Sequence, residues 1–346
     1  MGLQEASRGD GSTKSLKIVN LCFQDFAAAA YTLCHALNKW TRHKAIVLRS
    51  SDNVFAFPGI AEMRDYDRDQ VRKIVHKADV IIFHSAVAPF FEGLELDPKI
   101  IQQKRQILYC HGTELRTYGD DLFTQAEEIL KDWQMVVSTP DLLLYAPQNR
   151  GVKWLPVIRS VKDIRGRFSR SSPDEKALQA FVKKKKKVVL CHAPTSEEKK
   201  GSATFYRVIT KVVKTLPGTE FLTVHNQSWD RCLMLLAGSD VYFDADPPFI
   251  SSYGCLSIES GIFKHPVVTK ITQPVIDLIK KETGLPSPFI TFTSETELLA
   301  RTFKLAEDED LRQRFGRLMF RYARTVHDEK PVLERFNKIL EGMPCP

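Results

Sequence analysis

The chain has 346 residues, more than one hydrophobic core usually serves, so its length predicts two domains. Hydrophobic residues make up 43% and charged residues 27%, the balance of a globular protein, which argues against a disordered chain. No apolar run approaches the roughly 18 residues of a membrane-spanning helix. Residues 1–15 are expected to form a flexible leader, without the apolar segment of a signal peptide.

Charge and cysteine content narrow the choice of partners and compartment. The 50 basic and 42 acidic residues give a net charge of +8, which favours anionic partners: nucleotide phosphates, lipid headgroups at a membrane surface, or nucleic acid. The seven cysteines include no C-x-x-C pair, which argues against a disulfide framework or a zinc site. We therefore expect a cytoplasmic protein without a transmembrane segment.

Short β-branched runs alternate with helical segments along the first half of the chain. A first strand is predicted at residues 17–22 and a helix at 25–40. Further strands are predicted at 45–48, 80–83, 106–110 and 135–138. This βαβ alternation predicts a parallel sheet covered by helices on both faces.

The alternation pauses at residues 147–173, where Gly, Pro, Arg and Ser interrupt the pattern, and then restarts. Strands are predicted at 188–191, 220–224, 241–243 and 266–269, helices at 202–214, 229–236 and 255–263, and an apolar run at 289–292. The predicted domains are 16–160 and 161–328, followed by a C-terminal helix at 329–346. Two doubly wound sheets that face each other form a cleft for a ligand, and that geometry alone also suits a periplasmic binding protein or an epimerase.

A glycine opens the predicted helix at residues 255–263. Ser251, Ser252 and Tyr253 precede Gly254 in the segment SSYGCLSIE, which ends at Glu259 and is followed by the PVV strand. Gly254 lets the loop turn tightly into a helix whose N–H groups attract a diphosphate. Glu259 lies just over one turn into the helix, where it is placed to accept hydrogen bonds from a ribose diol.

Two further segments follow predicted strands. The sequence HAPTSEEKKG, residues 192–201, places Lys200 and Gly201 at a strand-to-helix connection, where a lysine is unfavourable unless an anion binds. The sequence HGTELR begins at His111, which is expected at the edge of the first sheet facing the cleft. Glu114 and Arg116 are expected to pair with each other.

Together with the STPDL segment at residues 138–142, these stretches resemble the family-4-like glycosyltransferases, also called group 1. The resemblance implies the GT-B fold, in which two Rossmann-like domains face each other across a cleft and a C-terminal helix packs back on the first. It also implies that Lys200 reaches the donor diphosphate, that His111 contacts the donor sugar, and that residues 251–254 and Glu259 bind the rest of the donor.

The sequence departs from the family pattern at four places. Ser251 replaces the glutamate that contacts the donor sugar, and Lys264 replaces a glycine before the proline. The arginine common before the lysine is absent, because Glu197 and Glu198 occupy that stretch. The glycine-rich turn after the first strand is replaced by Gln24, Asp25, Phe26 and four alanines, which predicts a less flexible loop.

The predicted activity is the transfer of a sugar from a UDP- or GDP-sugar to an acceptor hydroxyl. The resemblance implies retention of configuration, no tightly bound cofactor and no metal. The Asp244-Ala-Asp246 pair is therefore interpreted as loop carboxylates that cap a helix or stay solvated.

Two alternatives stay open. The charge of +8 motivates a glycosyltransferase that acts on a nucleic-acid base, and steep salt dependence of duplex binding would support it. Ser251 and the missing arginine motivate a non-catalytic nucleotide-binding module on the same fold. His225 and Trp229 are expected to pack in the core, with a nucleobase pocket as the alternative.

Overall fold

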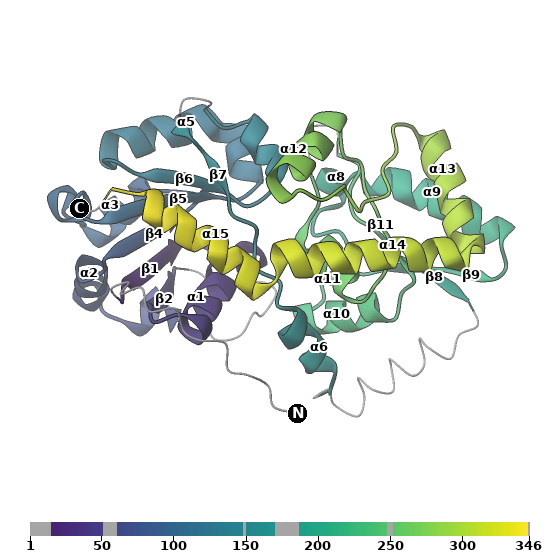
Figure 1. Ribbon diagram of the computed structural model, residues 1–346, viewed down its shortest axis with the longest axis horizontal. Coiled ribbons are helices and arrows are strands. Elements are labelled where there is room, and N and C mark those ends of the chain that lie inside the picture. The colour runs from purple at the N-terminus through teal and green to yellow at the C-terminus, as the bar shows by residue number, and fades with distance from the viewer. Residues whose placement is uncertain (1–14, 51–60, 148–149, 170–186, 248–251, 345–346) are drawn as a thin grey trace.

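The computed structural model describes residues 15–50, 61–147, 150–169, 187–247 and 252–344. The chain folds into two α/β halves, each built on a parallel sheet, with the last helix crossing from one half to the other (Figure 1). The expected leader and Ser251 lie outside the described residues, except for Ser15 of the leader. No helix within the described ranges is long and apolar enough to cross a membrane.

The first sheet has seven strands in the order β3-β2-β1-β4-β5-β6-β7, and every pair is parallel. Its strands are β1 (Lys17–Cys22), β2 (Lys44–Arg49), β3 (Ala61–Glu62), β4 (Val80–His84), β5 (Arg105–Cys110), β6 (Gln134–Val137) and β7 (Lys153–Trp154). The order reverses between β1 and β4, and such a switch point opens a crevice for ligands at the carboxyl ends of the strands.

Helices cover both faces of this sheet, as the βαβ pattern predicted. They are η1 (Phe26–Ala28), α1 (Ala29–Trp40), η2 (Met63–Asp65), α2 (Arg68–His76), α3 (Ala88–Leu94), α4 (Pro98–Ile101), α5 (Thr113–Ile129) and η3 (Pro140–Leu144). Asp67 begins α2 with a capping box, because its side chain accepts from the Gln70 N–H while Gln70 returns a bond to the Asp67 N–H.

The second sheet has four parallel strands in the order β11-β10-β8-β9. Its strands are β8 (Val188–His192), β9 (Thr219–Thr223), β10 (Val241–Phe243) and β11 (Val267–Val268). The switch point lies between β8 and β10. The apolar run at residues 289–292 adds only an isolated bridge from Ile290 to Val268.

The helices of the second half surround this sheet. They are α6 (Val161–Ser169), α8 (Glu197–Lys200), α9 (Ser202–Thr215), α10 (Trp229–Ala237), α11 (Cys255–Ile262), α12 (Gln273–Thr283), α13 (Glu295–Glu307) and α14 (Glu309–Tyr322). Helix α12 packs against η3 of the first half, so the two halves are in contact there (Figure 1).

The chain returns to the first half through the π-helical turn η5 (Ala323–His327) and helix α15 (Glu329–Gly342). Helix α15 buries one apolar face, which includes Val332, Phe336 and Ile339, in a cluster with Ile18 and Leu37 of the first half. The expectation that a C-terminal helix packs back on the first domain is therefore confirmed, whereas the proposed domain boundaries stay a prediction.

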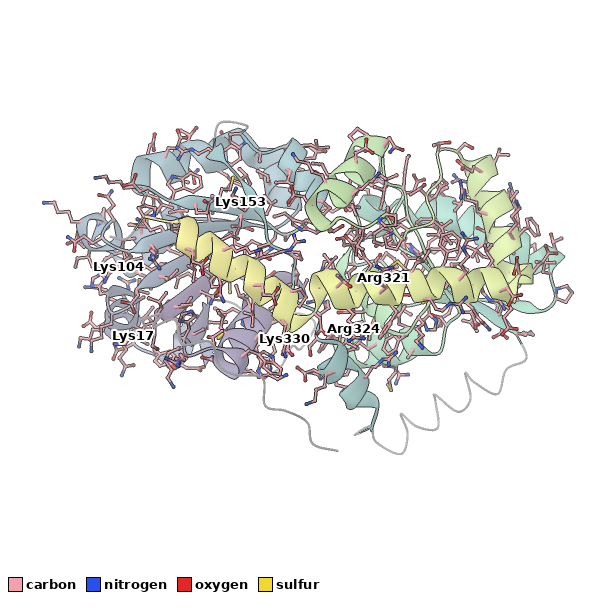
Figure 2. The ribbon with its side chains drawn as sticks, viewed as in Figure 1. Lys17, Lys104, Lys153, Arg321, Arg324 and Lys330 are labelled. Carbon is pink, nitrogen blue, oxygen red and sulfur yellow. The ribbon has the colours of Figure 1, made fainter. Side chains whose placement is uncertain are left out.

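Basic side chains occur in both halves. Lys17, Lys104 and Lys153 lie at the beginnings of strands in the first half, whereas Arg321, Arg324 and Lys330 lie where the chain crosses back (Figure 2). These six labelled cations are therefore spread over both halves of the molecule.

Candidate functional site

The two switch points bring the predicted site residues to facing edges of the sheets. His111 follows β5 in the first sheet, whereas Lys200 follows β8 and Gly254 follows β10 in the second. The carboxyl ends of parallel strands are where loops and helix N-termini converge on a ligand. The fold therefore places these residues at the edges where the sequence predicted a site.

His111 belongs to a chain of side chains that crosses the first switch point. Its Nε2 lies 2.8 Å from Nδ1 of His84, and Nε2 of His84 lies 3.1 Å from Oδ1 of Asn20. Asn20 Nδ2 donates to the Ile46 carbonyl, so Oδ1 accepts and His84 donates from Nε2. His84 Nδ1 then accepts from His111, which leaves Nδ1 of His111 as a hydrogen-bond acceptor.

Burial keeps both rings neutral. It lowers the pKa of His111 to about 3 and the pKa of His84 well below its usual value. The ring of Tyr109 lies 4.3 Å from that of His111 and fixes its orientation further. Nδ1 of His111 is therefore placed to accept a hydrogen bond near neutral pH, while its one N–H, at Nε2, faces His84. Sequence reasoning missed His84 and Asn20, although His84 ends a strand, the signal by which His111 was found.

Lys200 lies in an ion pair. Its Nζ is 2.5 Å from Oδ1 of Asp244, which immediately follows β10. Oδ2 of Asp244 accepts from the N–H of Gly254 at 2.6 Å and from the hydroxyl of Ser257 at 2.7 Å. Burial raises the pKa of Asp244, but the Lys200 charge and these hydrogen bonds outweigh it and hold the pKa below its usual value.

These contacts correct two expectations. The Gly254 N–H at the start of α11 was expected to be available to a phosphate, but it is bonded to Asp244. Asp244 was expected to be a capping or solvated loop carboxylate. It does cap α11, but it is buried rather than solvated, because three donors from two loops surround it.

Gly201 is required by the backbone around Lys200. It joins α8 to α9 with φ +62°, and an added Cβ would lie 2.0 Å from the Asp246 carbonyl oxygen. Asp246 in turn donates its N–H to the Lys200 carbonyl and pairs through Oδ1 with Lys270 at 2.9 Å. The Lys-Gly sequence therefore fixes the loop after β8 against the loop after β10.

Glu259 is buried and faces Arg159, which lies in the segment that joins the two halves. Oε1 of Glu259 is 2.8 Å from Nε of Arg159 and accepts from the indole N–H of Trp229 at 3.0 Å. Oε2 is buried without a hydrogen-bond partner among the described residues. Burial raises the pKa of Glu259, and the Arg159 charge opposes this effect. A buried oxygen without a partner can accept a hydrogen bond from a ligand group such as a hydroxyl.

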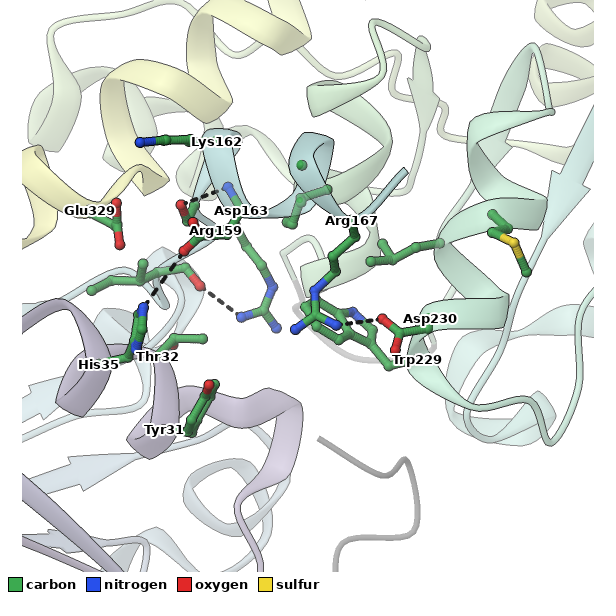
Figure 3. Close-up of a pocket in the computed structure, with 16 residues that line it drawn as sticks. Tyr31, Thr32, His35, Arg159, Lys162, Asp163, Arg167, Trp229, Asp230 and Glu329 are labelled. Atoms are coloured by element: carbon green, nitrogen blue, oxygen red, sulfur yellow. Dashed lines mark hydrogen bonds and ion pairs between the residues drawn. The ribbon is translucent and has the colours of Figure 1, made fainter. Parts of the chain in front are cut away.

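A pocket of about 670 Å³ adjoins this group on the side of α1 and α10 (Figure 3). Arg159 and Trp229 line it, together with Tyr31 of α1 and Arg167 of α6. Arg167 lies 4.4 Å over the Trp229 ring and pairs with Asp230. Trp229 is partly buried: it packs against the core, as expected, and also lines this pocket. His225 instead lies within hydrogen-bond distance of Tyr206.

Tyr253 faces the hinge between the halves. Its hydroxyl lies 2.8 Å from that of Tyr322 and 2.9 Å from Nε2 of His327, while Nδ1 of His327 lies 3.0 Å from the Val157 carbonyl. Tyr253 thus ties the loop before α11 to both crossings of the chain. Ser252 beside it is buried as well. These contacts suggest that Tyr253 positions the loop instead of touching the donor.

The loop after β1 adopts the backbone of a glycine-rich turn without any glycine. Ala27 and Ala28 have φ of 56° and 53°, in the left-handed region that alanine rarely occupies. Asp25 stabilises this loop by accepting from the N–H groups of Ala30 and Tyr31, both at 2.8 Å. The four alanines therefore do not prevent the turn. Burial raises the pKa of Asp25 to about 6.

The side chain of Glu114, the expected partner of Arg116, lies outside the described residues. The guanidinium of Arg116 contacts Asp141, with Nη2 2.5 Å from Oδ2. Asp141 is buried in η3, so the pair holds the end of the first sheet beside α12. The ion pair therefore gives the HGTELR and STPDL segments a structural role, because it joins one segment to the other.

One group of side chains near the pocket has the ligand types of a metal site. Atoms of His35, Asp163 and Glu329 lie within 4.8 Å of one another. Lys39 already pairs with Asp163 at 3.5 Å and with Glu329 at 2.9 Å. The lysine charge therefore neutralises the carboxylates that a cation would need.

Comparison with solved structures identifies the fold of the chain. No family model and no curated protein matches the sequence. Among solved structures, HepE from Anabaena in complex with UDP and glucose aligns at 12% identity, with TM-score 0.63 over 95% of this chain and 100% of that chain. The chain has the GT-B fold.

Two other solved structures align over a similar length. A glycosyltransferase from Rickettsia africae has 10% identity and TM-score 0.63, over 95% of this chain and 98% of that chain. The N-terminal domain of Candida albicans trehalose-6-phosphate phosphatase has 9% identity and TM-score 0.64, over 98% and 99%. Identities this low show the fold alone, so the activity rests on the site.

Proposed function

We propose that the protein is a glycosyltransferase that moves a sugar from a nucleotide-sugar to an acceptor hydroxyl. The observation that carries the proposal is Glu259: its Oε2 is buried without a partner among the described residues, and its Oε1 contacts Arg159 and Trp229, which both line the pocket. A ribose hydroxyl that donates to Oε2 would satisfy that oxygen. The pocket volume of about 670 Å³ falls in the range of small-molecule sites.

The residues around Glu259 suggest where each part of the nucleotide-sugar donor would bind. The nucleoside would lie in the pocket, with its ribose on Glu259 and its base near Trp229. The diphosphate would extend toward Lys200 and the first turn of α11, where an ammonium and a helix N-terminus favour negative charge. HepE, which has the same fold, binds UDP and glucose, so UDP-sugars are the first donors to test, followed by GDP-sugars.

His111 would meet the donor sugar from the opposite sheet. Its Nδ1 accepts a hydrogen bond, so it would orient a sugar hydroxyl and leave general acid–base chemistry to other groups. We propose that transfer proceeds with retention and without a tightly bound metal, with Lys200 stabilising the leaving diphosphate as its bond to the sugar breaks. Such a protein would work in the cytoplasm on a soluble acceptor or on one at a membrane surface.

A second function is favoured by one observation. Lys200 and the Gly254 N–H are already engaged by Asp244, and Oε1 of Glu259 is engaged by Arg159. A module that binds nucleotides without turning them over would also present these contacts. Only turnover separates it from the enzyme.

The test measures the rate at which UDP or GDP is released from a panel of sugar donors. Chromatography quantifies the released nucleotide with and without added sugar acceptors. Release is expected from one donor, and at least tenfold slower release from the Lys200→Met and Glu259→Gln variants. Lys199→Met, which removes the same charge one residue earlier on the exposed side of α8, should behave as wild type. Nucleotide binding without release from any donor would support the non-catalytic module instead.

A further inference from the structure

The second switch point contains a negative charge of its own. The carboxylate of Asp244 lies where the ammonium of Lys200, the N–H of Gly254 and the hydroxyl of Ser257 converge, at 2.5, 2.6 and 2.7 Å. An ammonium, a helix-terminal N–H and a hydroxyl are also the donor types that bind phosphate. Asp244 therefore has the coordination expected of a bound anion.

The packing leaves little room for a second anion while Asp244 is in place. A Cβ built on Gly254 would lie 3.0 Å from Nζ of Lys200 and 3.2 Å from Oδ1 of Asp244. The backbone of Gly254, the ammonium and the carboxylate are thus already in contact. A phosphate oxygen that used the same donors would have to take the place of the carboxylate oxygens.

We propose that Asp244 is an internal anion that competes with the donor diphosphate for Lys200 and the start of α11, and so sets the affinity of the site for diphosphates. This inference rests on the proposed function, because it concerns the same donor site. A diphosphate that binds there must replace Asp244 at the single N–H of Gly254 and compete with it for the charge of Lys200. Asp244 thereby lowers the affinity of the site for any ligand that offers only a diphosphate. Contacts with the nucleoside must then supply most of the binding free energy of the donor.

The neighbouring carboxylate provides a matched control. Asp246 lies two residues further along the same loop, but its side chain pairs with Lys270 at 2.9 Å and does not bind Lys200. Asp246→Asn changes the net charge by the same amount as Asp244→Asn. A general electrostatic effect would appear in both variants, whereas competition for Lys200 would appear only in Asp244→Asn.

The experiment is calorimetric titration of inorganic pyrophosphate and of UDP into wild type, Asp244→Asn, Asp246→Asn and the double variant Lys200→Met/Asp244→Asn. Asparagine retains a carbonyl oxygen for the Gly254 N–H, which keeps the helix cap. Asp244→Ser is the second variant, in case the amide disturbs folding, and thermal melts establish that each variant is folded. Asp244→Asn should bind both ligands at least tenfold more tightly than wild type.

The two ligands separate this inference from the proposed function. Tighter pyrophosphate binding by Asp244→Asn and Asp244→Ser, absent in Asp246→Asn and lost in the double variant, supports competition even if no variant binds UDP. In that case the donor proposal fails. Equal UDP affinity in wild type and folded Asp244→Asn overturns the inference while the donor site stands. No pyrophosphate binding by any folded variant also overturns it.

Discussion

Replacing Arg159 with methionine tests how the two halves are held at the candidate site. Arg159 is buried and has partners in three parts of the chain. Nη1 donates to the Ile158 carbonyl at 2.8 Å, Nη2 donates to the Ala27 carbonyl at 2.6 Å, and Nε lies 2.8 Å from Glu259. Methionine fills a similar volume and removes all three contacts.

The expected loss of stability follows from these contacts. Removing one partner of a buried ion pair costs about 3–5 kcal/mol, because the other charge stays buried. The carbonyls of Ala27 and Ile158 also lose their donor, at about 0.5–1.5 kcal/mol each where no water replaces it. The free energy of unfolding of Arg159→Met should therefore fall by about 4–8 kcal/mol, a large part of the roughly 5–15 kcal/mol that stabilises a typical domain.

The assay is urea denaturation of wild type, Arg159→Met, Glu259→Gln and the double variant. Glutamine keeps an oxygen for the Trp229 indole and carries no charge. The double variant should therefore lose at least about 2 kcal/mol less than Arg159→Met, since no buried carboxylate is left unpaired. A loss below about 1 kcal/mol in Arg159→Met, or effects of the two substitutions that simply add, would refute the buried-pair account.

Three further outcomes follow from the structure. Lys264→Gly should raise the free energy of unfolding by about 0.5–1 kcal/mol in urea denaturation, because Lys264 has φ +66° and glycine avoids most of that strain. Unchanged or lower stability would contradict this. Gly201→Ala should lower the free energy of unfolding by more than about 2 kcal/mol, since its Cβ would strike the Asp246 carbonyl, and equal stability would show that the loop can move. Acid should destabilise the fold, because burial lowers the pKa of seven histidines whose unfolded pKa is near 6.5, so the folded state binds fewer protons and stability is lost as pH falls below about 6.5. The seven are His43, His76, His84, His111, His192, His265 and His327. The raised pKa values of Asp25, Asp240 and Glu259 act in the opposite sense, but they are three groups against seven. A melting temperature at pH 5.0 that is not at least about 5 °C below that at pH 7.5 would contradict this balance.

Much of the fold could be predicted from the sequence because its strands are long, apolar and separated by helical periods. Strands β1, β4, β5 and β8 lie within one residue of their predicted ranges at each end. Strands β3 and β7 were missed because two residues each are too few to show any alternation. Residues 289–292 are apolar because they pack in the core, although they form only one bridge with the sheet.

The candidate site could be predicted only in part. Lys200, Gly201 and Gly254 were identified by short motifs that resemble those of the group 1 glycosyltransferases, a lysine beside glycine after a strand and a glycine before a helix. The partners that decide what these residues can bind lie far away in the sequence. Asp244 pairs with Lys200 across 44 positions, and Arg159 reaches Glu259 from the linker between the halves. Such pairings depend on tertiary packing, which periodicity and spacing do not report.

The left-handed turn at Ala27 and Ala28 shows the same limit. The sequence gives no sign of this conformation, which is held by the two N–H groups bound to Asp25 and by the Ala27 carbonyl bound to Arg159. Contacts within the folded protein thus override the intrinsic preference of alanine.

The most direct test of the donor site is calorimetric titration of UDP, GDP, ADP and CMP, and of their sugar conjugates, into wild type and Glu259→Gln. The account predicts that one nucleoside diphosphate binds, and that Glu259→Gln, folded by its thermal melt, weakens this binding at least tenfold. No binding by any nucleotide, or equal binding by the two proteins, would contradict the assignment of Glu259 and its pocket as the donor site.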